Sequence, residues 1–239
     1  MLAHVRKPPV VFALALGLGL SPAGHAAIWK ATLNQSNAES VFPDNADYLT
    51  VFIRDGSDAA GLLLNGYTTT SDDVVFSVDA LSVLDSKAGT NYGIDTFAFN
   101  TTLNPGGFTA NNFKLPSGWS LGSGNADGFG DFELKTDGGG QDRYDPVWFA
   151  ITGINGDNAN HYFALSGKNA GQGNYYFAAH VAGFNEALTG GTGGAWFAGS
   201  NGQPGTAPEP VPVPAAFWLF GSAVTGFAFA SRHSKPRLV

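Results

Sequence analysis

Clustered carboxylates are the residues of this chain whose types and spacing most readily suggest chemistry. One group, Asp127, Asp131 and Glu133, surrounds a Gly-Phe-Gly turn. Oxygen ligands on flexible loops suit Ca²⁺, and two carboxylates on one strand face suit glycoside hydrolysis. The spacing matches no EF-hand loop. We therefore favour solvated surface acids, keep structural calcium as an alternative, and rank a glycosidase pair of Asp131 and Glu133 third.

Few other residues could support catalysis. The chain has no Cys, which excludes thiolate catalysis and Cys-ligated metal centres. Its central region has two histidines, His161 and His180, each in a predicted strand, and they form no His-x-x-x-His or His-x-His pair. That region also has no phosphate-binding loop. We therefore expect a protein that is not an enzyme and needs no cofactor.

Aromatic side chains form the third candidate set, because the apolar faces of sugar rings can stack on them. The residues concerned are Trp119, Trp148, Trp196, Tyr144, Tyr175 and Tyr176. Most lie in or beside apolar predicted strands, so core packing is the favoured interpretation. A carbohydrate-binding face that includes Trp119, Trp148 and Trp196 is the alternative.

These residues are expected on β-strands and the turns between them. Short apolar segments recur between Gly-, Asn- and Asp-rich turns, and several alternate with period two. Val74, Phe76, Val78 and Ala80, for example, share one face. We predict strands at 48–54, 74–83, 93–100, 108–115, 129–136, 147–154, 161–166, 175–184 and 195–198. This pattern predicts an all-β, two-sheet sandwich over residues 27–198, jelly-roll-like in topology.

The charge of the central region limits its partners. Residues 27–207 contain seven Lys and Arg and 18 Asp and Glu, a formal charge of −11. Such a surface repels nucleic acid and anionic membranes, so no nucleic-acid partner is expected.

The N-terminus has the organisation of a secretion signal. Arg6 and Lys7 precede an apolar run from Val10 to Leu20, and small residues follow. The order of charge, apolar run and small residues predicts a signal peptide over 1–26, with cleavage between Ala26 and Ala27.

The C-terminus has three parts in order. Residues 199–212 form a Gly- and Pro-rich linker that contains Pro208-Glu209-Pro210. An uncharged apolar segment follows, predicted as a helix over 213–231, and 18 of its residues would span about 27 Å, close to the roughly 30 Å of a bilayer core. The tail at 232–239 is basic. Its Arg232, Lys235 and Arg237 would keep that end on the cytoplasmic side.

This arrangement resembles a PEP-CTERM sorting signal, the C-terminal tag of exported proteins in many Gram-negative bacteria that make exopolysaccharide. The likeness rests on Pro208-Glu209-Pro210, the Val-Pro-Val-Pro-Ala-Ala-Phe-Trp-Leu-Phe-Gly-Ser run and the basic end. It implies processing near the motif by an exosortase, an intramembrane protease-transpeptidase. It also implies a membrane-anchored precursor and a final place in the cell envelope, at the cell surface or in the extracellular matrix. A plain C-terminal membrane anchor is the alternative.

Two functions follow as expectations. The first is a non-catalytic surface or matrix protein associated with exopolysaccharide or biofilm. The alternative is a lectin-like carbohydrate-binding module, with or without structural calcium. A secreted polysaccharide hydrolase comes third.

Overall fold

The computed structural model describes residues 28–167, 171–199 and 209–211. The predicted signal peptide, the predicted helix over 213–231 and the basic tail all lie outside these residues. Within them, no helix is long and apolar enough to cross a membrane.

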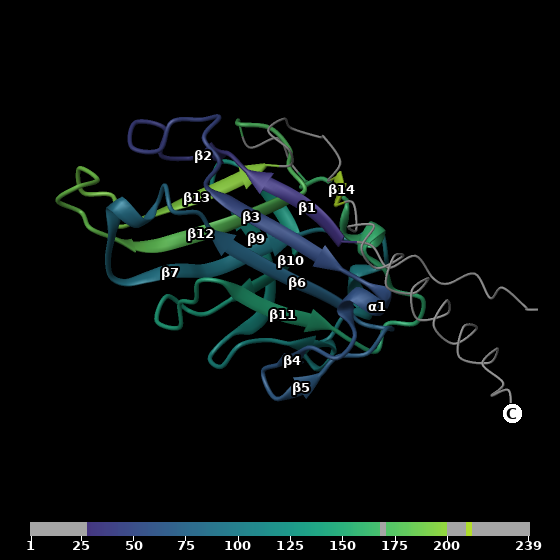
Figure 1. Ribbon diagram of the computed structural model, residues 1–239. Coiled ribbons are helices and arrows are strands. Elements are labelled where there is room, and N and C mark those ends of the chain that lie inside the picture. The colour runs from purple at the N-terminus through teal and green to yellow at the C-terminus, as the bar shows by residue number, and fades with distance from the viewer. Residues whose placement is uncertain (1–27, 168–170, 200–208, 212–239) are drawn as a thin grey trace, which may run out of the picture.

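Two antiparallel sheets pack face to face as a sandwich (Figure 1). The first sheet has the order β14 (Glu209–Val211), β1 (Ile28–Leu33), β3 (Leu49–Arg54), β6 (Val74–Ala80), β11 (Val147–Ile151) and β8 (Phe113–Lys114). The second has the order β2 (Gln35–Ser36), β13 (Gly194–Gly199), β12 (Phe177–Phe184), β7 (Ala88–Phe99), β10 (Gly130–Asp137) and β9 (Ser120–Ala126). The prediction of a two-sheet, all-β sandwich is confirmed.

Short elements connect or cover the sheets. They are the hairpin β4 (Leu63–Leu64) with β5 (Tyr67–Thr68), helix α1 (Gly56–Ala59), and the 3₁₀ turns η1 (Asp85–Lys87), η2 (Pro105–Gly107), η3 (Ala110–Asn112) and η4 (Ala159–Tyr162). Hairpin β4–β5 lies beside β11.

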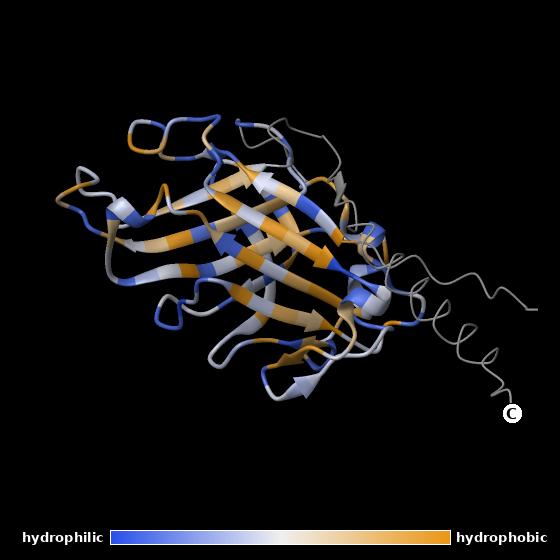
Figure 2. Cartoon of the chain, viewed as in Figure 1, coloured by the Kyte–Doolittle hydropathy of each residue, from blue (hydrophilic) through white to orange (hydrophobic). Residues whose placement is uncertain are grey.

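The main core lies between the sheets and is rich in Phe. Phe76 is its centre: its ring lies parallel to that of Phe149 at 4.9 Å, stacks on Phe99 at 5.0 Å, and meets Tyr162 edge-on at 5.2 Å. The predicted alternation in β6 is confirmed, because Val74, Phe76, Val78 and Ala80 all belong to this core. Figure 2 shows apolar residues along much of strands such as β3 and β11, and mostly polar residues in the loops between strands.

Each sheet also buries part of its outer face. On the first sheet, Val75 and Ala150 are covered by Ala59 of α1 and by Leu62 and Leu64 near the hairpin. On the second sheet, a separate cluster covers one end and comprises Ala98, Ala126, Phe129, Phe132, Tyr175, Ala178 and Ala198. The sandwich therefore has satellite cores, which leave only part of each outer face available for binding.

Two predicted strands need correction. The segment 161–166 is not a strand: Asn158 caps η4, and the side chains of Asn158 and His161 form a capping box that favours a tight turn. In the predicted strand 108–115 only Phe113–Lys114 pairs, because a capping box of Thr109 and Asn112 forms η3 instead.

Candidate functional site

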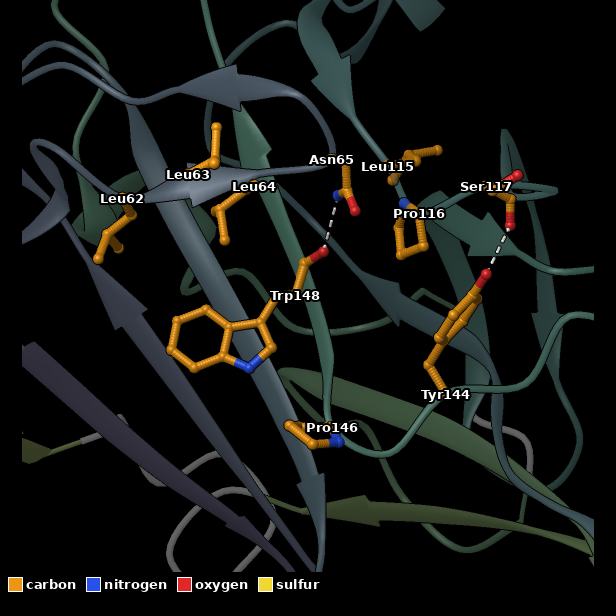
Figure 3. A pocket seen from close by; sticks show the side chains of 10 residues that line it. All are labelled: Leu62, Leu63, Leu64, Asn65, Leu115, Pro116, Ser117, Tyr144, Pro146 and Trp148. Carbon is orange, nitrogen blue, oxygen red and sulfur yellow. Dashed lines mark hydrogen bonds between the residues drawn. The ribbon is translucent and has the colours of Figure 1, made fainter.

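A groove on the outer side of the first sheet is the candidate binding site. It has a volume of about 800 Å³. We call it the Trp148 groove, and its lining residues are Leu62, Leu63, Leu64, Asn65, Leu115, Pro116, Ser117, Tyr144, Pro146 and Trp148 (Figure 3). Hairpin β4–β5 supplies one wall, the segment after β8 supplies another, and β11 with the residues before it supplies the rest.

The hairpin wall is fixed by its turn. Asn65 and Gly66 both have positive φ, 51° and 79°, and Asn-Gly is the sequence that best suits such a two-residue turn. The Asn65 side-chain amide donates hydrogen bonds to the carbonyl oxygens of Lys114 at 2.8 Å and Trp148 at 3.1 Å. One residue therefore sets the turn and ties the hairpin to β8 and β11 (Figure 3).

The opposite wall is held by Tyr144. Its hydroxyl donates a hydrogen bond to the carbonyl oxygen of Ser117 at 3.2 Å. Its backbone bridges to Ile94 of β7, and a cis peptide bond joins Asp145 to Pro146 directly after it. Backbone and side-chain hydrogen bonds therefore both restrain the segments that form this wall of the groove.

Trp148 is half-buried in the groove. The Arg54 guanidinium lies 4.8 Å from the centre of its ring and donates a hydrogen bond to Ser77 Oγ at 3.0 Å. Burial lowers the pKa of Arg54, and the nearby Asp58 carboxylate opposes this shift. The guanidinium covers part of the ring, and Leu62 and Leu64 pack on the same apolar cluster as Trp148. Leu63 also lines the groove, with a side chain that is largely exposed and points away from Trp148 (Figure 3).

The groove combines apolar surface with a few polar groups, which is how small-molecule and sugar sites are commonly built. Asn65 and Ser117 contribute the polar side chains, and Trp148 and Tyr144 contribute the aromatic ones. This arrangement can hold a ligand that has both apolar faces and hydroxyl groups.

The structure does not gather the three predicted tryptophans. Trp119 is 8% exposed, belongs to the main core, and donates its indole N–H to the Asp142 carbonyl at 2.7 Å. Trp196 packs on the cluster that covers the second sheet, 5.2 Å from the His180 ring. Tyr175 is buried in that cluster, and Tyr176 packs against the main core. Of the predicted aromatic set, Trp148 and Tyr144 line the groove.

The predicted carboxylate group lies on and beside β10. Asp127 occupies the turn before β10 and accepts a hydrogen bond from Asn37 Nδ2 at 3.2 Å. Asp131 accepts one from Asn125 Nδ2 at 3.3 Å, and Glu133 is exposed. Within residues 28–167, 171–199 and 209–211, no group of three or more His, Asp or Glu side chains could hold a metal ion. These three carboxylates therefore form no metal-ligand group, and Asp131 and Glu133 lie outside the Trp148 groove.

The second sheet contains a charged cluster that the sequence did not reveal. The β7–β12 register shifts between His180 and Val181, so Asp95 is the extra residue of a β-bulge. Its carboxylate lies 2.7 Å from His180 Nδ1 and 3.6 Å from Arg143 Nε, and its side chain is 7% exposed. Thr96 Oγ1 also donates to it, at 3.2 Å. These contacts give a buried carboxylate polar partners and connect β7 to β12 and to the segment that carries Arg143.

The other histidine belongs to a second buried carboxylate. Asp157 Oδ1 lies 3.1 Å from His161 Nδ1, and Tyr162 Oη donates to Asp157 Oδ2. Burial raises the pKa of Asp157, and the hydrogen bonds from Tyr162 and His161 partly oppose this. The same burial raises the pKa of Tyr162. His161 thus lies in η4, not in the strand predicted for it, and its contacts stabilise a turn.

The comparisons with known proteins gave no match: no family model, curated protein or solved structure is similar to this chain.

Proposed function

We propose that this protein is a non-catalytic, exported surface or extracellular-matrix protein associated with exopolysaccharide or biofilm. One observation carries the proposal: a segment with the pattern of a secretion signal and a segment that resembles a sorting tag flank a Cys-free, acidic β-sandwich. Strong negative charge favours solubility outside the cell, and no disulfide can form, so the domain depends on packing and hydrogen bonds.

The proposed route begins with cleavage between Ala26 and Ala27. The helix over 213–231 then anchors the precursor in the membrane, with Arg232, Lys235 and Arg237 on the cytoplasmic side. An exosortase-type enzyme recognises Pro208-Glu209-Pro210 and processes the chain near it. The product resides in the envelope, at the cell surface or in the matrix of a Gram-negative bacterium.

The proposal is tested by locating the native protein. Cells are separated into cytoplasm, membrane, polysaccharide matrix and medium, and the protein is detected in each with an antibody against the sandwich. We expect it in the envelope and matrix fractions, and we expect it to co-sediment with extracted exopolysaccharide. A protein confined to the cytoplasm would contradict the proposal.

The Trp148 groove favours a second candidate, a lectin-like module in a sandwich of the jelly-roll type, a fold that lectin domains use. Its ligand would be a sugar whose apolar face packs on Trp148, whose rim contacts Leu63, and whose hydroxyl groups face Asn65 and Ser117. Because the Leu63 side chain is exposed, Leu63→Gln should change the groove without disturbing the fold. It is tested together with Trp148→Ala.

Glycan binding by the purified protein separates the two candidates. The lectin hypothesis expects both groove variants to bind at least tenfold more weakly, while Trp196→Ala, on the other sheet, binds as the wild type does. Loss of binding on addition of EDTA would support structural calcium. If the groove variants and Trp196→Ala bind glycan with the same affinity, the groove is not the glycan-binding site.

A further inference from the structure

The last strand of the described chain pairs with the first. Strand β14, Glu209–Val211, lies antiparallel to β1 at the free edge of the first sheet (Figure 1). Ile28 stands opposite Val211, Trp29 opposite Pro210, and Lys30 opposite Glu209. Two of the three residues of Pro208-Glu209-Pro210 are therefore part of the sheet, although the sequence placed them in a linker.

The residue types suit this edge position. Proline has no N–H to donate, so it is tolerated in a strand at a sheet edge, where its nitrogen faces away from the neighbouring strand. Lys30 and Glu209 stand directly opposite in the register, and opposite charges at such positions favour strand pairing. The pairing is short, so its stability depends on few interactions.

Both strands of this edge lie next to a predicted processing site in the sequence. The predicted signal cleavage site, between Ala26 and Ala27, directly precedes β1, and β1 is the strand that β14 contacts. The predicted membrane helix begins at Val213, two residues after β14, a distance of at most about 7 Å along an extended chain. Before processing, the folded sandwich would hold Glu209 and Pro210 of the sorting motif against its own edge, a short distance along the chain from the predicted membrane helix.

We propose that the edge of β1 is a docking site for this chain's own sorting motif, and that release of β14 from β1 must precede processing. The physical reason is general: proteolysis of a folded chain proceeds through a locally opened state, at a rate that follows the population of that state. The docking depends only on the structure, whereas its effect on processing rests on the proposed function.

The test uses the full-length protein and a charge reversal that leaves the motif intact. Lys30→Glu places two like charges opposite each other, which weakens pairing. Lys114→Glu is the matched control, because it makes the same change on β8, at the far edge of the same sheet. Hydrogen exchange of Ile28 to Lys30 is measured on the protein purified in detergent, and loss of the tag is followed by pulse-chase labelling in the native cells.

We expect Lys30→Glu to accelerate both exchange and tag loss, by about two- to tenfold, and Lys114→Glu to change neither. Combining Lys30→Glu with Glu209→Lys should restore the slow exchange. Unchanged exchange in Lys30→Glu would overturn the docking, and faster exchange with an unchanged rate of tag loss would overturn its control of processing. If the wild-type protein never loses its tag, the proposed function is contradicted. The hydrogen-exchange rates of Ile28 to Lys30 would still show whether β14 pairs with β1.

Discussion

Asn65 offers a quantitative test of how the Trp148 groove is built. Asn65→Ala removes two hydrogen bonds to carbonyl oxygens, at 2.8 and 3.1 Å, worth about 0.5–1 kcal/mol each at an exposed position. It also places Ala at φ 51°, which costs about 1 kcal/mol more. The expected loss of unfolding free energy is therefore about 2–3 kcal/mol.

Asn65→Gly separates the two contributions. Glycine adopts positive φ without strain, so this variant loses only the hydrogen bonds, and we expect a loss of about 1–2 kcal/mol. Urea denaturation of the purified protein measures both variants, and Asn155→Ala, at an exposed Asn with ordinary backbone geometry, is the control. If Ala and Gly at position 65 leave stability within about 0.3 kcal/mol of the wild type, Asn65 does not hold the hairpin and the account of the groove is wrong.

Three further predictions concern the core and the two buried carboxylates. Phe76→Ala should cost about 3–5 kcal/mol, because it removes the centre of the aromatic core, and a loss under 1 kcal/mol in urea denaturation would contradict that position. Gly194→Ala would place a Cβ 2.9 Å from His180 Nε2 and should cost about 1–3 kcal/mol; the cost should shrink in a His180→Ala background, and an equal cost in both would refute the clash. The raised pKa of Asp157 means that its contribution to stability is complete below the ordinary aspartate pKa and is lost as pH rises through the raised value. The stability advantage of the wild type over Asp157→Asn should therefore be larger at pH 4 than at pH 7, and a constant difference in denaturation experiments would count against this.

The sequence predicted strands well where side chains alternate between apolar and polar. In β6 and β12 the residues in the main core are Val, Phe and Ala at every second position, and this period identifies the face that is turned toward the other sheet. The pattern failed for β9, whose residues are Ser-Leu-Gly-Ser-Gly-Asn-Ala. Such residues have little intrinsic preference for strands, and β9 forms because β10 offers it an edge to pair with.

The sites were harder to predict because they depend on register. Asp95, His180 and Arg143 are far apart in sequence, and Asp95 meets the other two at a bulge in β7. Trp119 and Trp148 belong to the same candidate set of aromatic residues. In the structure Trp119 is buried and its indole N–H donates a hydrogen bond, whereas Trp148 lines a groove. Composition alone does not distinguish a core tryptophan from a binding tryptophan.

The intact mass of the native protein, recovered from both the envelope and the medium, tests the central claim most directly. Our account predicts a chain that begins at Ala27 and lacks the residues after about Pro210, as a sorted and processed surface protein would. A mass that retains Val213 to Val239 would contradict the account, because it would indicate a plain membrane anchor instead of a sorting tag.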